Sequence, residues 1–224
     1  MTANLLANTT SAIETLTLTD GALRFQHDFY SLEFCQQAMQ QLTVETAWRH
    51  EQIVLFGKRI WQPRLVAAHG DAGVAYRYSG LTLPVHGWTP LLSGIKQAVE
   101  DVAGCPFNSV LLNFYRDQQD SMGWHSDDES ELGLDPVIAS ISFGATRKFK
   151  LKHKTRRDLP TLALDLADGS LLLMEGRTQT FWKHAVEKSR AVTGPRINLT
   201  FRQLQRPGRA NQRRGLETGA GPVL

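Results

Sequence analysis

The sequence contains very little cysteine, and this excludes several kinds of site. Its 224 residues include two cysteines, Cys35 and Cys105, which lie far apart. The chain therefore lacks the paired-cysteine spacing of a zinc or redox motif and the cysteine density of a disulfide-stapled secreted domain. We expect both cysteines to be reduced and to lie in or near the core. A reducing compartment would also keep a bound iron ferrous.

Long apolar runs are missing as well. No stretch reaches the length needed to cross a bilayer, and the N-terminus lacks the charged start and apolar block of a secretion signal. Hydrophobic residues make up 42% and charged residues 21% of the chain, a composition typical of one folded domain with a full core. The sequence thus predicts a cytoplasmic, nucleoid-associated protein without a membrane partner. We expect a monomer.

The positive charge is small in total but unevenly distributed. The net charge is +3, and basic residues gather in "KFKLKHKTRR" (148–157) and "RQLQRPGRANQRR" (202–214). Such patches fit a polyanion, although charge alone slightly favours an ordinary solubilising surface. There is no internal repeat. The pattern predicts a flexible segment over 1–20, one domain over 21–205 and a disordered basic tail over 206–224.

Two helices are well marked. In "SLEFCQQAMQQL", Ser31 can cap a helix whose apolar side chains recur on one face. In "TPLLSGIKQAVEDVAG", Thr89 supplies the cap, Pro90 suits the first helical position and Gly104 ends the helix.

From residue 108 onward the sequence predicts short strands punctuated by Gly, Asp and Pro. The candidates are "SVLLNFYR", "VIASISFG", "KFKLKH", "SLLLMEG", "TFWKHAV" and "RINLTFRQL". The segment "SFGATRKF" is typical of a hairpin turn between two of them. Helices followed by many strands favour an α+β class, with a two-sheet sandwich or jelly roll and the helices packed on one sheet.

A candidate metal site lies in "MGWHSDDE". On an extended segment, His125 and Asp127 point the same way and supply two thirds of a facial triad, although most such pairs are surface residues. A third ligand must come from another strand. His153 stands between lysines, a poor position for a dication, whereas His184 is as readily a packed histidine as a ligand. Two histidines and one carboxylate leave an octahedral face open, as in ferrous oxygenases, whereas structural zinc needs a fourth ligand.

A polar stripe in "PRINLTFRQL" is the second candidate. Its members alternate with apolar residues and share one strand face: Arg196, Asn198, Thr200 and Arg202. On alternation alone, an amphipathic strand facing solvent is the likelier interpretation. If the stripe lines a cavity beside a metal, its guanidiniums suit a dicarboxylate. Asn113 and Tyr115 also share a face and can hydrogen-bond a carboxylate, or can simply be polar residues of an edge strand.

These motifs together resemble the AlkB family of Fe(II)- and 2-oxoglutarate-dependent dioxygenases. "NFY", "HSD", the distal histidine and "RINLTFR" occur in the family's order, over roughly residues 50–205. "QPRLVAAHGDAGVAYRYSG" and "PVIASISFGATRKF" further resemble the branch that repairs alkylated duplex DNA. The resemblance implies a double-stranded β-helix (jelly-roll) core, a nucleotide lid at about 50–80 and one catalytic dioxygenase domain over 21–205.

The resemblance also implies roles for individual residues. Fe(II) would be held by His125, Asp127 and His184. The distal carboxylate of 2-oxoglutarate would be bound by Arg196, Asn198 and Tyr115, and its iron-chelating end by Arg202 and Asn113. With O2 as second cosubstrate, the enzyme would hydroxylate N-methyl groups of 1-methyladenine and 3-methylcytosine in DNA. Formaldehyde, succinate and CO2 would be released.

A base inside a duplex must be flipped out before it can reach the iron. By resemblance, Tyr78 would stack on that base with Tyr76 nearby, and Glu129 would contact its edge. Phe56 would fill the gap in the stack as an apolar wedge. Arg64 would belong to the lid. From the residues alone, core packing for the three aromatic side chains and an ordinary surface position for the arginine are the alternatives.

Two departures from the duplex-repair branch affect the prediction of the substrate. The basic loop "KHKTRRDLPTL" is short, and Glu187 interrupts the basic cluster in "VEKSRAV". Both changes weaken phosphate contacts, so the preference between single- and double-stranded DNA stays open. The alternatives are the same chemistry on RNA or on a protein side chain, and a catalytically silent nucleic-acid-binding relative.

Overall fold

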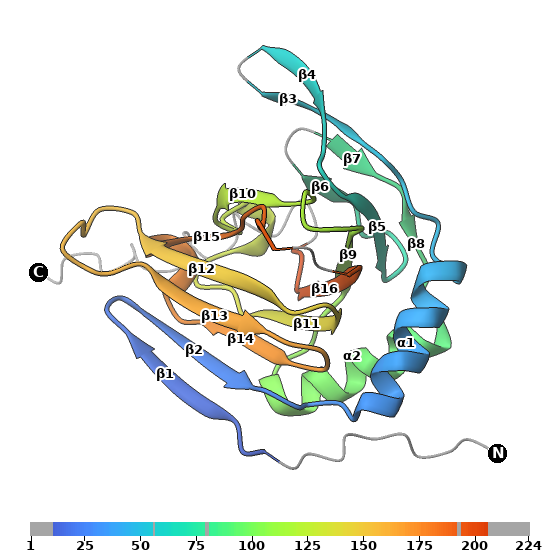
Figure 1. The fold of residues 1–224 in the computed structure, drawn as a ribbon, viewed down its shortest axis with the longest axis horizontal. Coiled ribbons are helices and arrows are strands. Elements are labelled where there is room, and N and C mark those ends of the chain that lie inside the picture. Colours follow the sequence, from blue (N-terminus) through green and yellow to red (C-terminus); the bar gives the residue numbers. More distant parts are fainter. Residues whose placement is uncertain (1–10, 56, 79–80, 192–193, 206–224) are drawn as a thin grey trace, which may run out of the picture.

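The computed structural model describes residues 11–55, 57–78, 81–191 and 194–205, in which strands are the main regular element (Figure 1). The large sheet contains, in spatial order, β1 (Glu14–Leu18), β2 (Gly21–Gln26), β14 (Leu171–Glu175), β11 (Ile138–Gly144), β16 (Arg196–Arg202), β9 (Ser109–Tyr115), β5 (Leu65–Gly70) and β8 (Val85–His86). The small sheet contains β10 (Met122–His125), β15 (Trp182–Val186), β12 (Arg147–His153) and β13 (Leu162–Leu166). Two separate hairpins are β3 (Gln52–Leu55) with β4 (Lys58–Trp61), and β6 (Tyr76–Tyr78) with β7 (Leu81–Leu83). The helices are α1 (Leu32–Glu45), α2 (Pro90–Ala103), α3 (Thr178–Phe181) and a 3₁₀ turn at Ser130–Leu132.

The chain passes repeatedly between the two sheets from β9 onward. Strands β9, β11, β14 and β16 belong to the large sheet, and β10, β12, β13 and β15 belong to the small one. This alternation gives a jelly roll, so the predicted strand-rich two-sheet core is confirmed. The segment "SFGATRKF" is not a hairpin turn, because β11 and β12 pair with different neighbours. It forms a corner between the sheets, where Gly144 adopts φ 86° and a Cβ would meet the Pro195 carbonyl at 2.5 Å.

The period-two alternation of the large sheet separates an apolar face from a polar one. On β16, Ile197, Leu199 and Phe201 are fully buried in a cluster that contains side chains of α1 and α2. The opposite face looks toward the small sheet. There Ile138 and Met174 share a second apolar cluster with residues of β12 and β15. The polar stripe of β16 therefore lies between two layers of strands and not in solvent.

Both predicted helices form at their capping residues. The Ser31 side chain accepts a hydrogen bond from the Phe34 amide at 3.3 Å at the start of α1. The Thr89 side chain does the same for the Leu92 amide at 3.2 Å, and Gly104 ends α2 in the left-handed region at φ 72°. The cap chemistry read from the sequence thus places the start of each helix correctly.

The first half of the chain contains more strand than the sequence predicts. Part of the supposedly flexible segment 1–20 is strand β1, which pairs with β2 and packs Leu16 and Leu18 against the second apolar cluster. Within the predicted lid region, β5 is a core strand that pairs with β9, whereas β3–β4 projects from the body (Figure 1). The region 50–80 is therefore part core strand and part separate hairpin.

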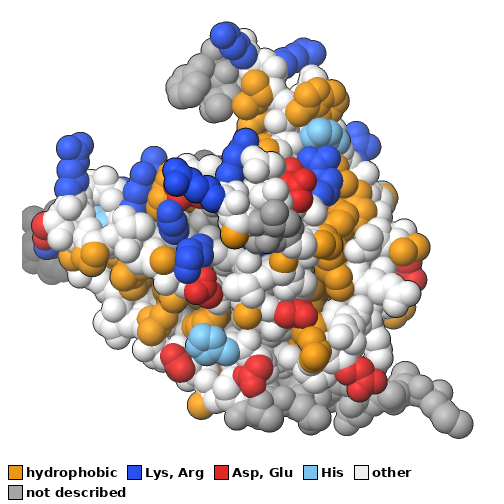
Figure 2. Space-filling view, in the orientation of Figure 1, with side chains coloured by type: hydrophobic (Ala, Val, Ile, Leu, Met, Phe, Trp, Pro, Cys, Tyr) orange, Lys and Arg blue, Asp and Glu red, His pale blue; other side chains and the backbone are white. Residues whose placement is uncertain are grey.

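Charged side chains are unevenly distributed on the surface. In Figure 2, Lys and Arg gather over the projecting hairpin and over the region of β12, whereas acidic side chains predominate in the lower part of the view. Lys58 and Arg59 of β4 are exposed, as are Lys148 and Lys152 of β12. No helix in the described ranges is long and apolar enough to traverse a membrane.

Candidate metal centre

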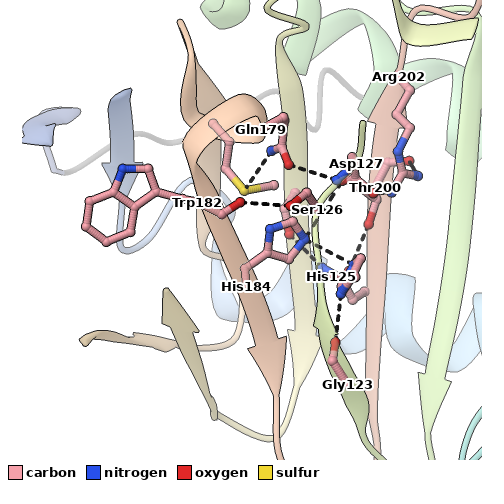
Figure 3. A network of polar contacts seen from close by, with 12 residues as sticks. Gly123, His125, Ser126, Asp127, Gln179, Trp182, His184, Thr200 and Arg202 are labelled. Atoms are coloured by element: carbon pink, nitrogen blue, oxygen red, sulfur yellow. Dashed lines mark hydrogen bonds and ion pairs between the residues drawn. The ribbon is translucent and has the colours of Figure 1, made fainter. Parts of the chain in front are cut away.

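The HxD pair and the distal histidine meet at one end of the small sheet. His125 is the last residue of β10 and lies opposite His184 of β15, and Asp127 follows two residues later. The two imidazole Nε2 atoms are 3.1 Å apart, and Asp127 Oδ2 lies 3.9 Å from His184 Nε2 (Figure 3). One donor atom from each residue fits within 4.8 Å of the others. In the described part of the chain, this is the one such group of three.

The three donors are in the protonation states that a metal requires. Burial lowers the pKa of His125, and burial together with the neighbouring His125 lowers that of His184 to about 3. Burial opposes ionisation of Asp127, but the charge and hydrogen bond of Arg202, together with the two neighbouring histidines, outweigh it and lower the pKa of the carboxyl to about 2. The imidazoles are therefore neutral and the carboxylate ionised at neutral pH.

An unsatisfied carboxylate oxygen supports the fit of a cation. Asp127 Oδ1 accepts from Arg202 Nη2 at 2.7 Å, whereas the buried Oδ2 has no hydrogen-bond partner and lies on the side of the histidines. Two imidazoles and one carboxylate suit a ferrous ion with an open coordination face. His153 lies elsewhere: its Nδ1 accepts from the Arg156 amide at 2.9 Å. Of the two histidines considered as third ligand, the structure therefore selects His184.

A cavity between the sheets adjoins the three donors. Its volume is about 500 Å³, open mouth included. Its walls include the whole predicted cosubstrate set, namely Asn113, Tyr115, Arg196, Asn198 and Arg202, together with His125, Asp127 and His184. The register explains this, because Tyr115 lies opposite Arg196 and Asn113 lies opposite Asn198 on adjacent strands. A small molecule in this cavity would contact the metal donors and the guanidiniums together.

Arg196 contributes a buried positive charge to the wall of the cavity. Its side chain is 1% exposed, with the guanidinium 5.1 Å from the Tyr115 ring and Nη2 donating to Ser142 Oγ at 2.9 Å. Burial lowers its pKa to about 10, so the group stays charged at neutral pH. Two of its nitrogens, Nε and Nη1, are buried without a hydrogen-bond partner. A carboxylate at the end of the guanidinium could accept from Nη1 together with the second N–H of Nη2.

The structure describes only some of the side chains predicted to contact the substrate. Phe56 lies outside the described residues, and Tyr76 and Tyr78 are placed as strand β6 without description of their side chains. Glu129 is half-buried just before the 3₁₀ turn, where burial and the nearby Asp127 raise its pKa. It therefore lies near Asp127 of the triad, and its contact with a base stays a prediction.

Arg64, which the resemblance assigns to the lid, has a buried side chain. Its side chain is 3% exposed, Nε donates to Asn113 Oδ1 at 2.7 Å, and Nη1 donates to the Ser121 carbonyl at 3.4 Å. Because Arg64 precedes the core strand β5 directly, its side chain turns into the protein. The structure thus places it behind a wall residue of the cavity.

Several side chains around the site were not predicted. Ser140 and Ser142 receive hydrogen bonds from Asn198 and Arg196, and the alternation in "IASISFG" could have indicated them. Phe149 stacks on the His184 ring at 5.2 Å, and Gln179 accepts from the Asp127 amide at 2.9 Å. Nothing local in the sequence marks these two, because their roles depend on how distant strands meet.

Comparison with known proteins gives a consistent picture. A family model described as "2OG-Fe(II) oxygenase superfamily" matches residues 22–202. The chain is 45% identical over 159 residues to "DNA oxidative demethylase ALKBH2" of Bos taurus, covering 68% of this chain and 57% of that relative. It is 40% identical over 182 residues to "Alpha-ketoglutarate-dependent dioxygenase alkB homolog 3" of Mus musculus, covering 78% of this chain and 63% of that relative. The chain thus spans less than two thirds of these curated relatives.

A solved structure supports the fold independently. The structure titled "The structure of OsALKBH1" aligns with a TM-score of 0.58 over 85% of this chain and 100% of that one. At 17% sequence identity, this likeness concerns the fold alone.

Proposed function

The chain belongs to the 2OG-Fe(II) oxygenase superfamily and, within it, to the AlkB family, and from this premise we propose that it repairs DNA by oxidative demethylation of N-alkylated bases. The substrates we propose are 1-methyladenine and 3-methylcytosine. Family membership implies Fe(II), 2-oxoglutarate and O2. The proposal rests mainly on one observation: the metal donors His125, Asp127 and His184 line the same cavity as two buried arginines.

Different residues of the chain would bind the iron and position the substrates around it. When bound, Fe(II) with 2-oxoglutarate and O2 supplies the oxidation that hydroxylates an N-methyl carbon, after which formaldehyde leaves the base. His125, Asp127 and His184 would hold the ion on one face. The protein contributes positioning and exclusion of water, both favoured by a cavity between two sheets.

The two buried arginines would orient 2-oxoglutarate by its two ends. Arg196, with Tyr115 and Asn198 beside it, would bind the carboxylate remote from the metal. Arg202 already donates to the metal-side carboxylate of Asp127, so it and Asn113 would contact the chelating end. Fixing both ends leaves the cosubstrate one orientation at the iron.

The scaffold would position these groups against a flipped nucleobase. We assign the helices α1 and α2 to bracing the large sheet of the double-stranded β-helix from its outer face, supported by their common apolar cluster. The hairpins within 50–80 would act as the nucleotide lid, with Tyr76 and Tyr78 stacking on the base, Phe56 as the wedge and Glu129 at the base edge. The single catalytic domain would comprise 21–205, and 206–224 a basic tail.

The partner we propose is alkylated DNA, with the strand preference decided by weak phosphate contacts. Three lysines of the β12 region are paired with acids of the same chain: Lys148 with Asp165, Lys150 with Glu187 and Lys154 with Asp128. Such pairing reduces the charge offered to a second strand. We therefore expect activity on single strands to be at least equal to that on duplexes.

The test uses an oligonucleotide that carries 1-methyladenine, first single-stranded and then annealed, together with Fe(II) and 2-oxoglutarate. Mass spectrometry should show loss of one CH2 from the oligonucleotide with succinate formed. Asp127→Asn should abolish both signals, and Asp128→Asn, at its exposed neighbour, should retain them. A methylated DNA strand left intact while a matched RNA strand is demethylated would contradict the proposed DNA substrate.

A further inference from the structure

We propose that Gln179 is a positioning residue of the metal centre, whose side-chain carbonyl fixes Asp127 in the orientation that the triad needs. The inference rests on the proposed function, because it concerns the iron site on which that function depends. It adds to that site a residue that contacts none of the reacting atoms.

Asp127 needs such support because the strand that leads to it has already ended. The last backbone pair of β10 with β15 is His125 with His184. The Asp127 amide is therefore beyond the sheet ladder, although the residue is only 2% exposed. A buried N–H without an acceptor bears the full cost of its desolvation. Gln179 Oε1 accepts from this amide at 2.9 Å and takes the place of the missing strand partner (Figure 3).

The Gln179 side chain is itself held in one orientation. It is 1% exposed, and its Nε2 donates to Met174 Sδ at 3.4 Å. A flipped amide would turn its own N–H toward the N–H of Asp127, so the two contacts determine which end faces the metal centre. The backbone carbonyl of Gln179 accepts from Lys154 Nζ at 2.9 Å, and the same ammonium pairs with Asp128 at 3.0 Å.

The position of Gln179 in the chain links the two parts of the triad. It lies on α3, directly before β15, the strand that carries His184. On the other side of Asp127, Ser126 Oγ donates to the Trp182 carbonyl at 3.0 Å (Figure 3). The segment from Gln179 to Trp182 thus binds both Ser126 and the Asp127 amide, and it leads directly into the strand that carries His184. Arg202 fixes Oδ1 separately, which leaves Oδ2 directed to the histidines.

Metal binding tests this role without turnover. Co(II), added to the metal-free protein without cosubstrate or DNA, is followed by titration calorimetry and by its visible absorption. Gln179→Met keeps the side-chain volume but removes the acceptor. We expect it to weaken Co(II) binding about 10-fold or more, as loss of outer contacts to metal ligands does, and to change the absorption of the bound ion. Gln179→Glu retains an oxygen acceptor and should bind Co(II) more tightly than Gln179→Met.

The matched control is Thr178→Val on the same turn. Thr178 is 1% exposed, and its hydroxyl donates to the Glu175 carbonyl at 2.6 Å, away from the triad. This variant should lower thermal stability while Co(II) affinity stays native. Equal affinities for native protein and Gln179→Met, or equal losses in Gln179→Met and Thr178→Val, would overturn the role of Gln179. Native protein that binds no Co(II) would instead overturn the proposed function, and the inference with it.

Discussion

The two buried arginines of the cavity differ in the partners that the protein gives their charge. Arg202 has its counter-ion within the protein, since it donates to Asp127 at 2.7 Å. Arg196 has no such counter-ion. Its guanidinium contacts the ring of Tyr115 and donates to the hydroxyl of Ser142, and its Nε and Nη1 have no hydrogen-bond partner. A desolvated guanidinium without a counter-ion is unfavourable, so a bound carboxylate both gains an ion pair and removes this cost. Affinity for the cosubstrate should therefore depend strongly on Arg196.

Arg196→Lys should weaken 2-oxoglutarate binding about 10- to 100-fold. An ammonium keeps the charge but cannot reproduce two parallel hydrogen bonds, each worth about 1.5–3 kcal/mol when charged. Calorimetric titration of the metal-loaded protein with 2-oxoglutarate measures the change. Arg24→Lys, at a partly exposed arginine paired with Glu175, is the control and should bind normally. Native affinity in Arg196→Lys would remove this residue from the cosubstrate site.

Arg64→Met separates a role behind the cavity wall from a role in the lid. Because Arg64 donates to Asn113, its loss should raise the KM for 2-oxoglutarate about 3- to 10-fold, the effect of one hydrogen bond. The KM for a methylated oligonucleotide should change little. Steady-state kinetics with each substrate varied in turn decides between the roles. If only the KM for the oligonucleotide increased, Arg64 would instead contact the nucleic acid as part of the lid.

At the scale of elements, the sequence predicted well wherever local chemistry determines structure. Caps and stripes placed α1 and α2, and alternation divided β16 into its two faces. The sequence could not decide whether the polar face meets solvent or a cavity, because that depends on the small sheet opposite. Among the strands of the first half that the sequence did not predict, β6, β7 and β8 have three residues or fewer. Such strands are defined by their partners more than by their own pattern.

The cap of α2 gives a prediction at this scale. Thr89→Ala removes the acceptor for the Leu92 amide and should lower the free energy of unfolding by about 1 kcal/mol. Urea denaturation of the metal-free protein measures this directly. Thr43→Ala, at an exposed threonine within α1, removes a hydroxyl but no cap, so it should not destabilise the protein. Comparable losses in both variants would argue against the cap as the cause.

For the whole molecule, electrostatics on the outer face of the small sheet should determine how it meets a polyanion. Glu187 lies at the centre of this region, 2.5 Å from Lys150 Nζ and 3.2 Å from Trp124 Nε1. Lys152 covers the same Trp124 ring at 4.2 Å. An acid in this place reduces the number of cations free to bind phosphates, and it also keeps the tryptophan beside His125 in place.

Glu187→Gln should therefore strengthen duplex binding. The amide can still accept from Trp124, but Lys150 becomes free to pair with a phosphate. We expect severalfold tighter binding at low salt, and a log–log dependence of affinity on salt steeper by about one unit. Fluorescence anisotropy with an unmodified duplex across a salt series measures both. Asp165→Asn releases Lys148, which lies farther from the triad. This variant shows whether releasing any lysine strengthens DNA binding to the same extent. An unchanged salt slope in Glu187→Gln would exclude Lys150 as a phosphate contact.

The position of β16 has a consequence for the order in which the protein is made. It is the last strand of the described chain, yet it lies between β11 and β9 near the middle of the large sheet. Until residues 196–202 leave the ribosome, both neighbours have an open edge, and unpaired edges invite pairing with other chains. The same strand carries both arginines of the cavity. Completion of the sheet and acquisition of the anion site therefore coincide, so a nascent chain can have neither without the other.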